Sequence, residues 1–228
     1  MSAVATRAGA AVTAVAASAY RIPTDGPESD GTFAWDATTL VVVEVEGGGE
    51  RGLGYTYGDA SVAGLASGLL AEAVRGVDVL DTGAAHAAAA SALRNAGRTG
   101  PGAMALSALD VALHDLKARA LGVPLWRLLD AVRARVPVYG SGGFTSYDDG
   151  RLAAQLSGWA GEGIPRVKIK VGREPDRDEH RVDVARGAIG DGVELMVDAN
   201  GAYARKQALR WAERFAARGR ARRSRASS

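Results

Sequence analysis

The feature that most constrains the fold is an alternation of strand and helix patterns in the second half of the chain. Three short β-type segments occur there, at Val136–Tyr139, Arg166–Val171 and Glu194–Val197. Each is followed by a helical pattern, at Asp148–Glu162, Pro175–Ile189 and Arg205–Ala217. Alternation at a spacing of roughly thirty residues is typical of right-handed βαβ units, which place their strands in one parallel sheet. We therefore expect an α/β domain over residues 131–217.

The first half has the opposite order, with strands first and helices after them. Strand patterns at Val12–Ile22, Leu40–Glu46 and Gly52–Tyr57 predict a meander, with a glycine-rich turn before the third strand. Between the first two strands, the turn-rich segment Pro23–Phe33 predicts a mobile loop. Helical patterns follow at Ser61–Val74, Thr82–Ala96, Ala103–Leu121 and Leu125–Leu129. Residues 1–130 are thus expected to form an α+β domain.

Composition excludes several classes of protein. Apolar residues make up 47% of the chain, which is enough for a substantial core, and cysteine is absent. Disulfide frameworks, thiolate catalysis and thiolate metal sites are therefore excluded. We find no secretory signal pattern and no long apolar run of the kind that spans a membrane, so the expected location is the cytoplasm.

Basic residues are concentrated at the end of the chain. Residues 214–228 contain six arginines and no acidic residue, whereas the rest has more acidic than basic side chains. We expect residues 218–228 to be a disordered basic tail. Such a tail can bind nucleic acid or acidic lipids, but it has no interleaved aromatic residues, and no nucleic-acid partner is expected.

Two lysines in one predicted strand are the first candidate functional residues. In Arg166–Gly172, side-chain alternation directs Val167, Ile169 and Val171 to one face, and Lys168 and Lys170 to the other. Two neighbouring ammonium groups in a buried strand repel one another, which favours loss of a proton and suits a lysine to act as a base. The alternative is an edge strand with a solvated lysine face.

An acid and an amide end the next predicted strand. Asp198 and Asn200 follow the apolar segment Leu195–Val197, and strand ends carry the catalytic groups in β/α barrels. A carboxylate there is a plausible ligand for Mg²⁺, which prefers oxygen donors. The alternative is that Asp198 begins a turn or caps the next helix.

Together, the two strand ends indicate one type of reaction. They would place lysine amines beside a carboxylate, with a bound metal to balance the charges. This combination suits abstraction of a proton α to a carboxylate, with a lysine as the base and the metal stabilising the enediolate.

The same residues carry a family resemblance. The Lys168–Lys170 strand, followed about thirty residues later by Asp198-Ala199-Asn200, resembles the mandelate racemase/muconate lactonizing enzyme branch of the enolase superfamily. So does the helix at Ala108–Lys117, which leads into Leu121–Leu129. The resemblance extends from about Val12 to Phe215. It implies an α+β capping domain followed by a partial (β/α) barrel of the enolase type.

The resemblance also implies roles for individual residues. Lys170 would be the acid/base lysine, Lys168 would bind and polarise the substrate carboxylate, and Asp198 would be the first Mg²⁺ ligand. Asn200 would contact substrate or order the site, and Ser141 is a weaker candidate for substrate contact. The segment Pro23–Phe33 would match the loop that closes over substrate. The implied substrate is a small carboxylate, such as a hydroxy acid or a sugar acid, and the implied assembly is a homo-oligomer.

An enolase-type barrel has about eight strands, and only three are predicted here. The resemblance places the remaining metal ligands and the second catalytic group on later strands, so we expect a truncated and inactive chain, with a frameshift as the hypothesis for its tail. The alternative is a non-catalytic fragment, or a binding or dimerisation module. His86, His114 and His180 are interpreted as surface or packing residues.

Overall fold

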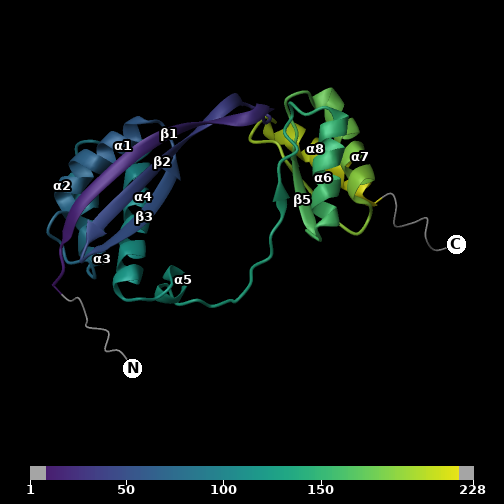
Figure 1. Cartoon of the computed structure of the whole chain (residues 1–228). Helices are drawn as coiled ribbons and strands as arrows, with labels where there is room; N and C mark the ends of the chain where they lie inside the picture. The colour runs from purple at the N-terminus through teal and green to yellow at the C-terminus, as the bar shows by residue number, and fades with distance from the viewer. Residues whose placement is uncertain (1–8, 221–228) are drawn as a thin grey trace. The chain divides into compact units, whose positions relative to one another are not determined.

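A computed structural model describes residues 9–220, and the chain in it divides into two compact units. The first unit comprises the chain up to Pro23 together with Ala37–Ala134. The second comprises Thr24–Asp36 together with the chain from Arg135 onward. The far end of the first β-hairpin therefore belongs to the second unit, although its base belongs to the first (Figure 1).

The first unit is built on a three-stranded sheet in the order β1-β2-β3, formed by β1 (Val12–Ser29), β2 (Ala34–Gly47) and β3 (Glu50–Tyr57). Strands β2 and β3 are antiparallel, in a register that runs from Leu40 opposite Tyr57 to Gly47 opposite Glu50. Gly48 and Gly49 make the turn between them, both with positive φ. That backbone conformation is accessible to glycine at little cost, which is why the glycine-rich segment becomes a hairpin.

The segment Pro23–Phe33, predicted as a loop, is mostly strand. β1 continues to Ser29 and β2 begins at Ala34, so the turn is confined to the residues between them. In this turn the Asp30 carboxylate accepts hydrogen bonds from the backbone N–H groups of Thr32 and Phe33, at 2.7 and 2.8 Å. The loop prediction was wrong because β1 is an edge strand of its sheet, where prolines are tolerated.

Helices cover one face of this sheet (Figure 1). They are α1 (Ser61–Leu65), the π-helical segment η1 (Ala66–Leu70), α2 (Ala71–Val74), α3 (Thr82–Ala92) and α4 (Pro101–Ala120). The short helix α5 (Leu125–Leu128) follows α4 and buries none of its residues. The helix predicted over Ser61–Val74 is thus present, with a π-helical segment inside it. The core of the first unit lies between the sheet and these helices. It combines alternate valines of β2 with leucines of α4, namely Val41, Val43, Val45, Leu109, Leu113 and Leu116.

Helix α4 lies directly on β3 because two glycines of the strand have no side chain. A Cβ atom on Gly54 would lie 2.0 Å from the carbonyl oxygen of Ala108, and one on Gly52 would lie 2.1 Å from that of Ala112. Both contacts are with helix backbone, which cannot move aside as a flexible side chain can. These glycines therefore set the separation between the helix and the sheet.

The second unit contains a parallel sheet in the order β4-β5-β6, formed by β4 (Gly140–Ser141), β5 (Arg166–Lys170) and β6 (Glu194–Asp198). The strands alternate with α6 (Asp149–Gly161), α7 (Pro175–Ile189) and α8 (Arg205–Arg220). Val167, Ile169 and Val171 are completely buried with Leu152 and Leu156 of α6. The expected α+β domain and partial parallel β/α domain are both confirmed.

The predicted strand Val136–Tyr139 is not formed, and β4 comprises only Gly140 and Ser141. The side chains of Val136, Val138 and Tyr139 are 66%, 57% and 48% exposed. Preference for β structure depends on packing against neighbouring strands, and these residues lack such packing. The sequence therefore predicts a first strand of the parallel sheet correctly, but the strand lies directly after the predicted residues, at Gly140–Ser141.

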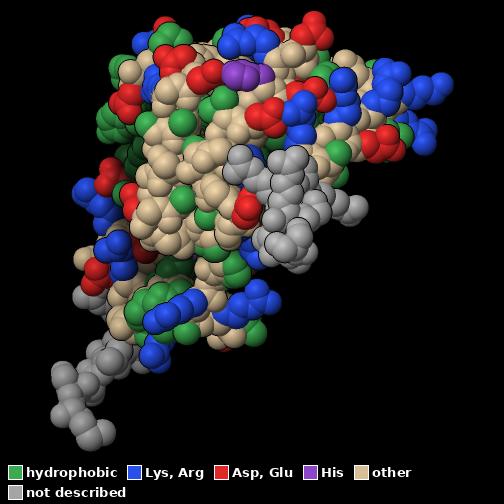
Figure 2. All heavy atoms as spheres, turned by 90° about the vertical axis from the view of Figure 1, so that its right-hand side faces the viewer, with side chains coloured by type: hydrophobic (Ala, Val, Ile, Leu, Met, Phe, Trp, Pro, Cys, Tyr) green, Lys and Arg blue, Asp and Glu red, His purple; other side chains and the backbone are tan. Residues whose placement is uncertain are grey.

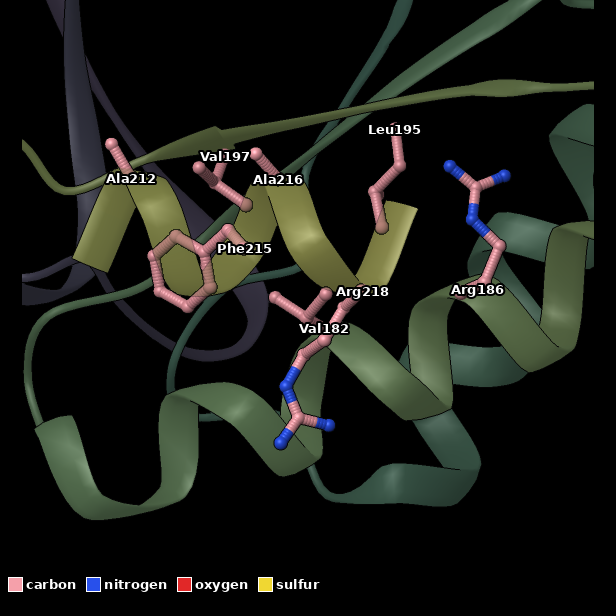
Figure 3. Close-up of a pocket in the computed structure, with 8 residues that line it drawn as sticks. All are labelled: Val182, Arg186, Leu195, Val197, Ala212, Phe215, Ala216 and Arg218. Carbon is pink, nitrogen blue, oxygen red and sulfur yellow. The ribbon is translucent and has the colours of Figure 1, made fainter. Parts of the chain in front are cut away.

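An apolar pocket of about 300 Å³ lies between β6, α7 and α8 (Figure 3). Leu195 and Val197 of β6, Val182 of α7 and Phe215 of α8 contribute apolar side chains to it. Val197 is 39% exposed, so the helix-facing side of β6 is only partly covered.

The C-terminal helix extends further than predicted. Arg218, expected to begin the disordered tail, lies in α8 and forms ion pairs with Glu179, at 2.9 Å, and with Asp183. The rest of that predicted tail, residues 221–228, lies outside the described residues. None of the helices within residues 9–220 combines the length and apolar character that a membrane span requires.

Replacing Gly54 with alanine is expected to destabilise the first unit by about 2–3 kcal/mol, because the new methyl group must push α4 away from β3. Urea unfolding followed by far-UV circular dichroism measures this change. Gly83→Ala is the matched control, since a Cβ atom there has no neighbour within 4 Å. Equal stability of the two variants would contradict the close packing of α4 on β3.

Candidate functional site

The predicted site residues lie at the C-terminal ends of adjacent parallel strands. In the sheet register, Ser141 of β4 is the partner of Lys168, and Lys170 is the partner of Asp198 on β6. Alternation along β5 directs Lys168 and Lys170 to the face opposite that of the buried Val167 and Ile169. The strands therefore bring the lysines and the acid together on the face of the sheet that the helices do not cover.

Both lysines contact the same carboxylate oxygen. The Nζ atoms of Lys170 and Lys168 lie 2.8 and 3.1 Å from Oδ2 of Asp198. Lys170 also donates a hydrogen bond to the side-chain oxygen of Asn200, at 2.9 Å. We refer to Lys168, Lys170, Asp198 and Asn200 as the lysine–aspartate cluster.

The lysines are not on a solvated strand face. β5 lies between β4 and β6 in the sheet, so it is not an edge strand. The side chains of Lys168 and Lys170 are only 19% and 12% exposed. The interpretation of a solvent-facing edge strand is therefore wrong, and the two positive charges are held at a partly buried position.

The electrostatics of the cluster favour an ionised aspartate. Burial alone would raise the pKa of Asp198, but hydrogen bonds from Lys170, the Asn200 backbone and Lys168 outweigh burial and lower that pKa to about 2. Asp198 thus remains a carboxylate at neutral pH. Within the cluster, its one negative charge faces two ammonium groups, so the cluster favours a further anion.

Asp198 also takes part in a turn. Its Oδ1 accepts a hydrogen bond from the backbone N–H of Asn200 at 2.9 Å, and Asn200 has a φ of 49°. Asparagine tolerates this left-handed conformation better than most residues. The interpretation of Asp198 as a turn residue therefore holds alongside its contacts with the lysines.

Asp198 provides the chemistry of one ligand to a hard cation. Its carboxylate oxygens, beside the amide oxygen of Asn200, are the donor type that Mg²⁺ prefers. Within the described part of the chain, however, no group of three or more histidine, cysteine, aspartate or glutamate side chains could hold a metal. The described residues therefore supply part of the ligand set of a magnesium site and do not complete it.

Tyr139 adds a contact that the sequence analysis missed. The ammonium group of Lys168 lies 5.5 Å from the centre of the Tyr139 ring, within the range of a cation–π interaction. Tyr139 directly precedes β4, and an aromatic residue so close to a strand end was the signal available in the sequence. Ser141, the predicted substrate contact, is exposed beside Lys168 in the register.

The far end of the first hairpin packs within the same unit as the cluster. Ser29 and Thr145 pair through their hydroxyl groups at 2.6 Å, and the Thr145 backbone donates to the Ser29 carbonyl at 2.8 Å. Trp35 stacks on Phe33 and meets Phe144 edge to face, with ring centres 6.1 and 5.4 Å apart. Phe33 is nevertheless 65% exposed, so the hairpin end presents an aromatic side chain to solvent.

The three histidines all contact aspartates away from the cluster. His86 lies 2.9 Å from the carboxylate of Asp110, and His114 contacts the backbone oxygen of the same residue at 2.8 Å. His180 lies 2.6 Å from the Asp149 carboxylate.

Figure 2 shows basic and acidic side chains interspersed on the face that it presents.

Two family models match the chain. Residues 13–130 match the N-terminal domain of mandelate racemase and muconate lactonizing enzyme, and residues 151–220 match the enolase C-terminal domain-like family. Known relatives include sugar-acid dehydratases, cycloisomerases and epimerases.

Individual relatives agree with these matches. The chain is 36% identical over 205 residues to the 3,6-anhydro-α-L-galactonate cycloisomerase of Streptomyces coelicolor, covering 86% of this chain and 56% of the relative. A mandelate racemase/muconate lactonizing enzyme-like structure from Rubrobacter xylanophilus has a TM-score of 0.89 and 60% identity, covering 92% of this chain and 58% of that one.

A third relative is a structure with ligands bound. The L-talarate/galactarate dehydratase of Salmonella typhimurium, liganded with magnesium and L-lyxarohydroxamate, has a TM-score of 0.81 and 28% identity, covering 94% of this chain and 58% of that one. The chain thus spans little more than half the length of these relatives. With matching family models in both halves, it belongs to the mandelate racemase/muconate lactonizing enzyme family of the enolase superfamily.

Proposed function

We propose that the lysine–aspartate cluster transfers a proton at the carbon α to a carboxylate, with Lys170 as the acid/base group. The observation that carries this proposal is the position of the Lys170 amine, 2.8 Å from Asp198 and 2.9 Å from Asn200 at the ends of two parallel strands. An amine held in this way has a fixed direction, which is what proton transfer at carbon requires.

In the proposed step, Lys170 acts in its neutral form, after its ammonium group has released a proton, and this amine accepts the proton as the C–H bond breaks. The electron pair of that bond is delocalised into the substrate carboxylate, giving an enediolate. Lys168, whose ammonium group lies 3.1 Å from Asp198, pairs with the substrate carboxylate and offsets the growing negative charge. In this proposal Asn200 holds the Lys170 amine in place, and Ser141 donates a hydrogen bond to substrate.

Asp198 would hold magnesium as one of its ligands. Bound magnesium stabilises the carboxylate oxygens of the substrate as negative charge develops on them. Because the described residues do not bring three or more candidate ligands together, we propose that this chain by itself binds magnesium weakly and does not complete a racemase or dehydratase reaction. The proposed substrate class is a small hydroxy acid or sugar acid, and the proposed location is the cytoplasm.

The second candidate is a non-catalytic chain, a fragment or a dimerisation module. The observation that favours it is the incomplete ligand set around Asp198. The two candidates differ in one property: a proton-transfer site exchanges the α-proton of a bound hydroxy acid with solvent, and a non-catalytic chain does not.

Of the predictions that follow from this proposed function, the first concerns the exchange. We expect slow incorporation of deuterium at the α-carbon of hydroxy acids and sugar acids in D₂O with Mg²⁺, measured by proton NMR. Lys170→Met is expected to reduce the rate by about 100-fold or more, since it removes the base. The matched control is Lys206→Met, at an exposed lysine of α8, which should retain the wild-type rate. Exchange no faster in the wild type than in Lys170→Met would favour the non-catalytic alternative.

The second prediction concerns magnesium. Isothermal titration calorimetry should give a dissociation constant on the order of millimolar or weaker, because a single carboxylate binds a hydrated divalent cation poorly. Asp198→Ala should abolish this binding, whereas Asp191→Ala, at an exposed loop position, should not. Micromolar affinity that depends on Asp198 would mean that the protein assembles further ligands, and would contradict an incomplete site.

The third prediction concerns stability and pH. The folded state lowers the pKa of Asp198 to about 2, below its usual value of about 3.9. The resulting stabilisation is complete above about pH 4 and is lost as the pH falls through 2, and partial exposure limits it to about 2 kcal/mol. Asp198→Asn should therefore be less stable than the wild type at pH 6, and the difference should shrink towards pH 2, in urea unfolding followed by tryptophan fluorescence. A difference independent of pH would contradict the ion pair.

A further inference from the structure

Two charged side chains in the first turns of α7 are buried. Among the described residues, Asp178 and Arg181 are the charged residues that are almost completely buried, with 1% and 5% of their surface exposed. Removing a charge from water is costly unless hydrogen bonds replace the hydration shell. Burial accordingly raises the pKa of Asp178 and lowers that of Arg181. Their partners indicate what this placement achieves.

Asp178 joins the loops that follow β5 and β6. Its two carboxylate oxygens accept the backbone N–H of Gly172, at 3.1 and 3.0 Å, and its Oδ2 also accepts the hydroxyl of Tyr203. Gly172 is two residues beyond Lys170, and Tyr203 is three residues beyond Asn200. One carboxylate thus links the chain just after the base to the chain just after the carboxylate and amide of the cluster.

The two loops are also in direct contact at this point. Gly172 has a φ of 102°, and a Cβ atom there would lie 2.7 Å from the Cβ of Ala202. The Val171 backbone donates a hydrogen bond to the carbonyl of Asp198 at 3.1 Å. Because the loops are this close, a change in the hydrogen bonds of Asp178 is transmitted to the separation between the ends of β5 and β6.

Arg181 fixes the third loop, which follows β4. Its guanidinium group donates hydrogen bonds to the carbonyl oxygens of Tyr147, Gly143 and Phe144, at 3.0, 3.1 and 2.8 Å. The carbonyl of Gly143 also accepts the backbone N–H of Lys170, at 2.9 Å. Arg181 therefore supports the same lysine from the other side of β5.

We propose that Asp178 is a positioning residue, which holds Lys170 against Asp198 and Asn200 by binding Gly172 and Tyr203 together. The proposal rests on the function proposed above for the cluster, because Asp178 touches no reacting atom itself. It goes beyond that function because it proposes that Asp178, on helix α7, aligns the Lys170 amine. If Asp178 served only general stability, its loss would loosen the whole unit rather than the two lysines.

The test is lysine reactivity in the intact chain. The sequence contains four lysines, Lys117, Lys168, Lys170 and Lys206, so acetylation by an N-hydroxysuccinimide ester, followed by mass spectrometry, reports each one separately. Asp178→Leu is expected to increase the labelling rates of Lys170 and Lys168 by about threefold or more, because labelling follows the fraction of time in which the amines are released. Lys117 and Lys206 should keep their wild-type rates.

Two further variants separate alignment from general stability. Tyr203→Phe removes only the link to the β6 loop and should give a smaller increase at the same two lysines. Asp178→Asn should restore near wild-type labelling, because its oxygen can accept from Gly172 while its amide donates to the Tyr203 hydroxyl. If Asp178→Leu does not fold, Tyr203→Phe and Asp178→Asn decide the question.

The proposal is overturned if the folded Asp178→Leu and Tyr203→Phe variants label at wild-type rates, or if Lys206, the other lysine of the second unit, becomes more reactive together with Lys168 and Lys170. Deuterium exchange at the α-carbon, measured on the same variants, is expected to fall with the rise in labelling. Selective labelling changes in a chain without any wild-type exchange would leave Asp178 as the positioning residue and would refute the proposed proton transfer instead.

Discussion

The interaction on which the site depends is the sharing of one carboxylate oxygen by two ammonium groups. Lys170 and Lys168 approach Oδ2 of Asp198 to 2.8 and 3.1 Å while remaining largely buried. Two like charges this close to each other would separate without the carboxylate between them. The parallel register provides the arrangement, because it places Lys170 opposite Asp198 and brings the ends of β5 and β6 to one edge. The pairing of the strands and the pairing of the charges therefore support each other.

The backbone around this cluster is held by buried polar groups rather than by apolar packing alone. Apolar side chains fix the helix-facing side of β5, where Val167 and Ile169 are completely buried. The loops that follow the strands have no apolar face that packs against the helices, so their position depends on hydrogen bonds. Asp178 and Arg181 supply these bonds from one helix to three loops. Burying two charged side chains costs stability, and here the cost is offset by hydrogen bonds that fix the loops carrying the site residues.

Much of this arrangement follows from local patterns in the sequence. Alternation in Arg166–Val171 was enough to predict which face the lysines occupy, and the spacing of strands and helices was enough to predict the parallel sheet. The partners of Asp178 could not be predicted, because Pro175–Ile189 is rich in charged residues and resembles an exposed helix. Its burial arises only when loops distant in sequence converge on it. The extension of β1 to Ser29 was missed for a similar reason, since the residues that hold it, such as Thr145, are far away in the chain.

The charge of the cluster bears on what can bind there. Two ammonium groups and one carboxylate leave an excess of positive charge in a partly buried position, and a carboxylate substrate would neutralise it. A cation that binds Asp198 must instead compete with Lys168 and Lys170 for Oδ2, and with the Asn200 backbone for Oδ1. Binding a cation at this point is thus favourable only if other anionic ligands join Asp198 and if the displaced ammonium groups find new partners, such as a substrate carboxylate. Metal binding and substrate binding at this cluster are therefore expected to reinforce each other, because each supplies the charge that the other requires.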